Sequence, residues 1–255
     1  MNKNLLKRIV LTSAIAVLGV STSFAALVME RDQSVDTAPS VGMYRFEVPV
    51  ELQGTYNSVG VANLTASMEK EPNTLSMNVA HVKGNPSESY VVEIYKDLAA
   101  IETHRKSDHY QAFVNEVGSK LTNRKMYDVQ SVLLFEKKDA LSIVNDGKAV
   151  VTLTEFTVDS NEIDTVQRQY QLDMERAVRD DVGYKAGYVL RERNAKNRWY
   201  IIQIYSNQEA LTKHLNSPGY RFMMSQIQGS LQNVTTKVLD GDIFVNHGGQ
   251  AFVRP

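Results

Sequence analysis

The chain has 255 residues, a formal net charge of −1 and no cysteine. The lack of cysteine excludes a catalytic thiol, a Cys-ligated metal site and an iron–sulfur cluster. Acidic and basic residues are interspersed and nearly equal in number, 29 against 28, so the basic surface that nucleic-acid binding requires is missing and we expect no nucleic-acid partner.

Residues 1–25 have the pattern of a secretory signal peptide. Three basic residues are followed by an apolar run over 9–20, and Ser23 and Ala25 supply small residues at a cleavage site. Cleavage would change the net charge from −1 to −4. We expect a periplasmic or secreted protein without stable membrane insertion after cleavage; the alternative is an uncleaved anchor.

The polar residues 26–42 are predicted to form a tether, and a first module is expected over 43–136. Alternating apolar and polar residues, together with a break at Pro72, predict its elements in chain order. Strands are expected at 43–52, 75–82, 89–95 and 126–135, and helices at 57–70 and from Asp97 toward 121.

A linker over 137–148 leads to a second module over 149–247 and a C-terminal tail over 248–255. Ser160 is the expected N-cap of its first helix. Strands are predicted at 150–158, 184–191, 199–205 and 236–245, with a second helix ending near 231. Both modules thus have the order β-α-β-β-α-β, which predicts an α+β chain of two tandem ferredoxin-like modules.

The two modules also share identical residues at a constant offset of 110 positions, so that Tyr90 corresponds to Tyr200. Internal repeats of this kind indicate a duplicated unit. The recurring pairs are Tyr90/Tyr200, Ile94/Ile204, Tyr95/Tyr205, Ala100/Ala210, His104/His214, Ser107/Ser217 and Tyr110/Tyr220.

The second helix of each module is predicted to break at the same place. Ser107 and Ser217 both look like new N-caps, and Pro218 occupies a position where first-turn proline is favoured. His104 and His214 therefore end a short helix just before a kink.

These residues resemble the antibiotic-biosynthesis-monooxygenase family, which includes quinol monooxygenases. The resemblance lies in a strand ending Glu93-Ile-Tyr95, then Ala100, then His104-Arg-Lys-Ser107-Asp108-His109-Tyr110, where only the family's proline is replaced by Asp108. The second copy keeps Pro218 but has Gln203 for the glutamate and Gly219 for the second histidine. The resemblance to the family covers about 20 residues in each module.

The resemblance implies a dimeric α+β barrel in which two sheets pack face to face. A duplicated chain would supply both halves as an intrachain pseudo-dimer, with further self-association open. It also implies oxidation of a small phenolic or quinol compound without metal, flavin or heme, so no cofactor and no metal site are expected. In a heme-degrading branch the ligand histidine would fall on Val114 or Met224, which makes heme chemistry unlikely.

The predicted catalytic residues are His104, Glu93 and His109, because a histidine that titrates near neutrality suits proton transfer. Residues predicted to orient an aromatic substrate are Tyr95, Tyr110, His214, Tyr205, Tyr220 and Trp199. Each has a structural alternative: the histidines could serve the helix kink or lie on the surface, and the aromatic residues could be core.

Three functions remain open from the sequence. The chain is an exported oxygenase, a non-catalytic protein that binds a small apolar ligand, or a structural or stress-related protein with the same fold. A ligand-sized cavity lined by His104 and Tyr95 would favour the first two.

We predict that the exported protein begins after Ala25. Signal peptidase recognises the small residues there once the apolar run has entered the export machinery. N-terminal sequencing of protein recovered from the periplasm or medium tests this, and a mature chain that begins at Met1 would contradict it.

Overall fold

The computed structural model describes residues 38–255. The predicted signal peptide and most of the predicted tether lie outside the described residues. Within 38–255, no helix combines the length and the apolar character needed to cross a membrane.

Two modules of the predicted order follow one another along the chain. The first contains β1 (Ser40–Glu47), α1 (Gln53–Lys70), β2 (Thr74–Val82), β3 (Asn85–Tyr95), α2 (Leu98–Lys106), α3 (Asp108–Val117) and β4 (Thr122–Tyr127). The second contains β7 (Val150–Val158), α4 (Ile163–Asp180), β8 (Tyr184–Glu192), β9 (Arg198–Tyr205), α5 (Gln208–Leu215), α6 (Pro218–Ile227) and β10 (Leu231–Asn246). Three further strands are β5 (Val129–Glu136), β6 (Leu141–Val144) and β11 (Ala251–Val253).

The predicted break in the second helix is confirmed in both modules. The side chain of Ser107 accepts a hydrogen bond from the backbone N–H of Tyr110, and Ser217 does the same for Tyr220. Asp97 caps α2 through the N–H of Ala100. Each second helix is therefore two short helices with a serine cap between them.

Some predicted boundaries were wrong. β1 begins at Ser40, inside the predicted tether, and ends at Glu47, because Pro49 has no N–H to donate to a sheet and residues 50–52 form a 3₁₀ turn. Glu162, not Ser160, precedes α4. The predicted linker and tail also contain β6 and β11, which pair with β10 and β5.

The last strand of each module crosses into the other module. The first part of β10 pairs with β7, and its second part pairs with β2 of the first module. In the same way β4 pairs with β1, while β5, one residue further on, pairs with β8. This exchange explains why the single strand predicted at 126–135 is two strands, since its halves bond to different modules.

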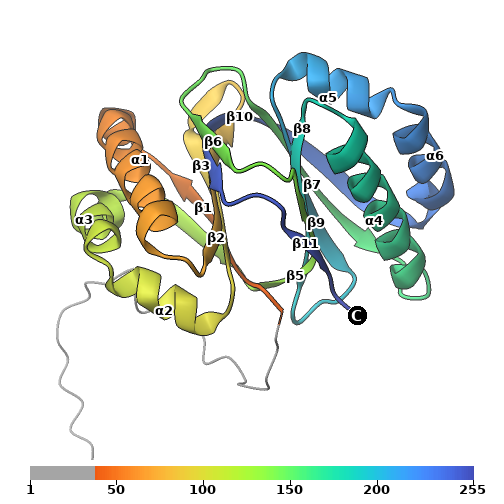
Figure 1. Cartoon of the computed structure of the whole chain (residues 1–255), viewed down its shortest axis with the longest axis horizontal. Coiled ribbons are helices and arrows are strands. Elements are labelled where there is room, and N and C mark those ends of the chain that lie inside the picture. The colour runs from red at the N-terminus through yellow and green to blue at the C-terminus, as the bar shows by residue number, and fades with distance from the viewer. Residues whose placement is uncertain (1–37) are drawn as a thin grey trace, which may run out of the picture.

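All strands join one hydrogen-bonded sheet in the order β11-β5-β8-β9-β7-β10-β2-β3-β1-β4, with β6 attached to β10. Figure 1 shows α1, α2 and α3 outside the strands of the first module and α4, α5 and α6 outside those of the second. The inner faces share one core that draws on both modules, including Met43, Val92, Leu153, Tyr188 and Ile202. Buried residues of both modules thus form one common core.

A buried polar cluster interrupts the shared core. Glu136 is 6% exposed and accepts a hydrogen bond from the hydroxyl of Tyr188 at 2.7 Å. The Tyr188 hydroxyl also lies 3.0 Å from Ser76 Oγ. Burial raises the pKa of the Glu136 carboxyl to about 7, although hydrogen bonds from Tyr188 and Ser76 oppose that rise.

We predict that Glu136→Gln stabilises the protein above neutral pH. Because the folded-state pKa of Glu136 exceeds its unfolded value, ionisation of the unfolded chain lowers stability as pH rises from about 4.5 to about 7. Relative to the unmodified protein, the free energy of unfolding of the variant should be higher by up to about 3 kcal/mol at pH 8. The difference should be small below about pH 4. Urea unfolding at both pH values measures the difference, and an equal change at the two would contradict the argument.

Candidate functional site

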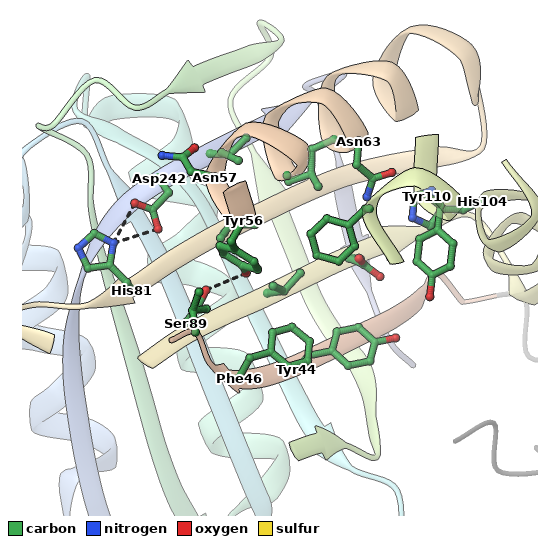
Figure 2. A pocket seen from close by; sticks show the side chains of 18 of the residues that line it. Tyr44, Phe46, Tyr56, Asn57, Asn63, His81, Ser89, His104, Tyr110 and Asp242 are labelled. Atoms are coloured by element: carbon green, nitrogen blue, oxygen red, sulfur yellow. Dashed lines mark hydrogen bonds and ion pairs between the residues drawn. The ribbon is translucent and has the colours of Figure 1, made fainter. Parts of the chain in front are cut away.

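The first module holds a cavity of about 200 Å³ between the outer face of its sheet and helices α1 to α3. Apolar side chains form most of its walls, among them Phe46, Leu64, Val79, Val91 and Ile243. Ile243 belongs to β10, so the second module supplies part of the wall. Figure 2 shows polar side chains at both ends, with Tyr56 and Phe46 between them.

Two small residues keep this space open. Gly60 and Ser89 line the cavity, whereas the positions 110 residues later hold Tyr170 and Trp199. Both large side chains are buried against Phe156, with ring centroids 6.0 and 6.3 Å from it. The equivalent space in the second module is thus filled by aromatic packing.

His104 lies at one end of the cavity and is 1% exposed. Its Nδ1 lies 3.1 Å from Glu71 Oε2 and 3.3 Å from Ser67 Oγ. Its Nε2 is buried and has no hydrogen-bond partner among the described residues. His104 therefore presents one occupied and one unoccupied nitrogen.

Glu71, which the sequence analysis did not select, holds both His104 and His109. It caps the C-terminus of α1 and accepts hydrogen bonds from His104, from His109 Nε2 at 2.7 Å and from Thr74 Oγ1 at 2.6 Å. Burial opposes its ionisation, but these hydrogen bonds outweigh burial and lower its pKa to about 2. An ionised Glu71 can only accept, so it fixes the Nδ1–H tautomer of neutral His104.

The repeat could have revealed Glu71. The residue 110 positions later is Asp181, which caps the C-terminus of α4 and lies 3.0 Å from His214 Nδ1. A carboxylate thus recurs with each histidine, but Glu and Asp are not identical and the pair escaped a search for identities.

Glu93 and the tyrosines complete the polar end near His104. Tyr95 donates its hydroxyl hydrogen bond to Glu93 Oε2 at 3.0 Å. Burial raises the pKa of the Glu93 carboxyl, although the charge of His104 opposes that shift. The Tyr110 ring stands edge-on to His104, with centroids 4.9 Å apart, and burial raises the pKa of Tyr110 to about 12. Glu93, Tyr95 and Tyr110 all line the cavity.

His109 does not line the cavity; its Nε2 lies 2.7 Å from Glu71 Oε1. Its predicted catalytic role is therefore limited to supporting Glu71, because its bonded Nε2 points at that carboxylate. Of the three predicted catalytic residues, His104 and Glu93 line the cavity.

The predicted binding residues of the second module take a different place. Trp199, Tyr205, His214 and Tyr220 do not line the cavity, and the first three are at most 1% exposed. Trp199 belongs to the core behind α4 and α6. These residues therefore pack within the second module and lie outside the cavity of the first.

An arginine replaces the second histidine in the second module. Arg176 bonds Asp173 at 2.9 Å and Asp181 at 3.2 Å, and a side chain at Gly219 would collide with it. Gly219 stands where the first module has His109. Both modules therefore hold the helix-capping carboxylate between the shared histidine and a second nitrogen-bearing side chain.

Glu71, His104 and His109 are also residue types that bind metals, with one potential ligand atom each within 4.8 Å of the others. Direct hydrogen bonds already join these atoms, and the ion pairs of the second module preserve the same arrangement with a guanidinium. Hydrogen bonding alone thus accounts for the cluster.

The sequence pattern described as "Antibiotic biosynthesis monooxygenase" matches residues 42–116 and 149–225, which together exceed half of the chain. The chain belongs to the antibiotic biosynthesis monooxygenase family. It carries two copies of the family's domain, as the repeat predicted.

Solved structures of similar fold span nearly the whole tandem chain. A proposed monooxygenase from Lactobacillus acidophilus NCFM has a TM-score of 0.78 at 19% identity, covering 84% of this chain and 99% of its own. One from Fusobacterium nucleatum has a TM-score of 0.76 at 18% identity, covering 86% and 100%. An anthrone oxidase-like protein reaches 0.52 at 11% identity, covering 87% and 98%. These likenesses concern the fold. No curated protein matches the chain.

We predict that Ser89→Trp closes the cavity of this family member. Trp199 shows that the fold accommodates tryptophan at the equivalent position, so the variant should fold and lose binding of small aromatic compounds. The reciprocal Trp199→Ser should lower the free energy of unfolding by about 3–5 kcal/mol, as large core truncations do. It should leave the binding of small aromatic compounds intact. Calorimetric titration and thermal unfolding of both variants measure these effects. Undiminished binding by Ser89→Trp would rule out this cavity as the ligand site.

Proposed function

We propose that this chain is a monooxygenase that oxidises a small phenolic or quinol compound in the cavity of its first module without a cofactor. The observation that carries the proposal is His104, which lines the cavity and whose buried Nε2 has no hydrogen-bond partner within residues 38–255, while Glu71 holds its Nδ1. We also propose that it acts outside the cytoplasm after signal-peptide cleavage.

His104 would act as the general base. With the proton of neutral His104 held on Nδ1 by Glu71, Nε2 carries a lone pair that can accept the proton of a phenolic hydroxyl. The resulting imidazolium would remain paired with the Glu71 carboxylate, which stabilises the charge that develops during proton transfer.

The cavity would then favour reaction of the phenolate with dioxygen. Its apolar walls exclude water, and an electron-rich phenolate can form a carbon–oxygen bond with O₂. Loss of water from the peroxide leaves a quinone: one oxygen atom becomes the new carbonyl, and the other departs as water with the two hydrogens lost by the phenol. The proton taken by His104 returns to the departing oxygen.

Glu93 would serve this reaction as a hydrogen-bond donor. Its raised pKa favours the protonated carboxyl, which can donate to a substrate oxygen. Gln203, at the equivalent position of the second module, has a similar shape and is always neutral. The amide of Gln203 is a hydrogen-bond donor at this position, which supports the assignment.

A non-catalytic role is the second candidate, and one observation favours it. His214 has the same burial as His104 and an equivalent carboxylate partner, Asp181, although the space beside it is filled. The shared histidine could therefore serve the fold in both modules, with the cavity of the first module only binding a ligand.

We predict that His104→Ala and His214→Ala differ in activity but not in stability. Each removes a 1%-exposed histidine from a carboxylate that caps a helix, so both should destabilise the protein to a similar degree. Only His104→Ala should lower turnover, on the order of 10²–10⁴-fold for a lost general base.

Oxygen consumption measures turnover. The substrates are dihydroxynaphthalenes and anthrone, the latter chosen because one structural neighbour is called anthrone oxidase-like. Thermal unfolding measures stability. Equal and small losses of turnover in both variants would favour the non-catalytic role.

A further inference from the structure

A second histidine–carboxylate pair lies at the far end of the same cavity. His81 Nδ1 lies 2.8 and 3.0 Å from the two carboxylate oxygens of Asp242, and both residues line the cavity. Figure 2 places this pair and His104 at opposite ends, with Tyr56 between them. The reaction proposed above does not use the pair.

Asp242 engages one of the two ring nitrogens of His81. Nδ1 is held by Asp242, while Nε2 lies 3.9 Å from Asp240 Oδ2, beyond hydrogen-bond distance. The hydrogen bond to Asp242 also raises the pKa of His81, which favours a protonated ring whose Nε2–H can donate.

A β-bulge directs Asp242 toward His81. In the pairing of β10 with β2, Gly241 lies opposite Ala80 and Ile243 opposite Val79, so Asp242 is the extra residue. Bulges often redirect a side chain beside a functional site. The second module has the same shift in β5, between Ser131 and Leu133.

The residues at the matching positions of the second module could not form such a pair. The extra residue of β5 is Val132, which is buried in the core, and the counterpart of His81 is Arg191. The bulge therefore belongs to the fold, whereas the His81–Asp242 pair occurs only where the cavity is open.

The two polar ends are separated along the sheet. His81 lies opposite Ser89 in the pairing of β2 with β3, and Glu93 follows four residues later on β3. Four residues of strand span about 13 Å. A ligand that reaches both ends therefore needs an apolar body with an oxygen-bearing group at each extremity.

We propose that His81, held by Asp242, binds a second oxygen-bearing group of the ligand at the end of the cavity opposite His104. The site thus selects elongated aromatic compounds with a hydroxyl or carbonyl oxygen at both ends. This inference rests on the proposed function only for the assignment of the reacting end.

The pair also gives the second module a role in this site. Asp242 and Ile243 come from β10, the last strand of the second module. The cavity of the first module is therefore incomplete without the second, even though the equivalent space in that module is filled.

Matched ligand pairs test the proposal. The first pair is β-naphthol and naphthalene-2,6-diol, which differ only in the distal hydroxyl; the second, longer pair is para-hydroxybiphenyl and its symmetric diol. In at least one pair the full-length protein should bind the diol about tenfold more tightly, as one hydrogen bond to a charged group allows. Calorimetric titration under nitrogen measures binding without turnover.

His81→Ala should weaken diol binding about tenfold, to the level of the mono-alcohol, and leave mono-alcohol binding unchanged. Asp242→Asn, a milder change, should reduce the preference for the diol over the mono-alcohol. Arg191→Ala, the matched control in the second module, should preserve that preference. Circular dichroism verifies folding of each variant.

Equal weakening of both ligands by His81→Ala, or no preference for either diol, would overturn the proposal while leaving the proposed oxygenase intact. Failure of the unmodified protein to bind any of the four compounds would overturn both.

Discussion

The structure depends on one apolar core that the inner sheet faces of both modules build together. Each module covers one face of its sheet with helices, and the other face is apolar and would be exposed in isolation. Burial of such a surface contributes about 25 cal/mol per Å². The exchanged strands β5 and β10 fix how the faces meet, because each bonds to the opposite module. Glu136 and Tyr188 place a polar pair within that interface.

Duplication freed the two modules to diverge outside this shared core. Both retain a carboxylate at the end of the first helix that holds a histidine at the end of the next. Around this shared histidine–carboxylate pair, the second module has large aromatic side chains and an arginine. The first module has small residues and a second histidine there. The first module consequently contains a cavity where Tyr170 and Trp199 fill the equivalent space of the second.

The cavity connects the two halves functionally as well as structurally. Its His104 end is built by the first module alone, and its His81 end needs a carboxylate from the strand that crosses over. Loss of the second module would remove the partner that covers the sheet and also one end of the cavity. The same strand exchange therefore supports both stability and the site.

The sequence by itself determined the duplication, the element order, the helix break and the family, because these depend on local patterns: alternation in strands, serine caps, and residues recurring at one spacing. It also selected His104, Glu93, Tyr95 and Tyr110, all of which line the cavity. Only the tertiary structure decided the rest. Glu71 and His104, or His81 and Asp242, lie far apart along the chain, and their contact depends on helix packing and strand exchange. Whether Trp199 lines a cavity or fills one depends on the side chains packed opposite it, which no local pattern records.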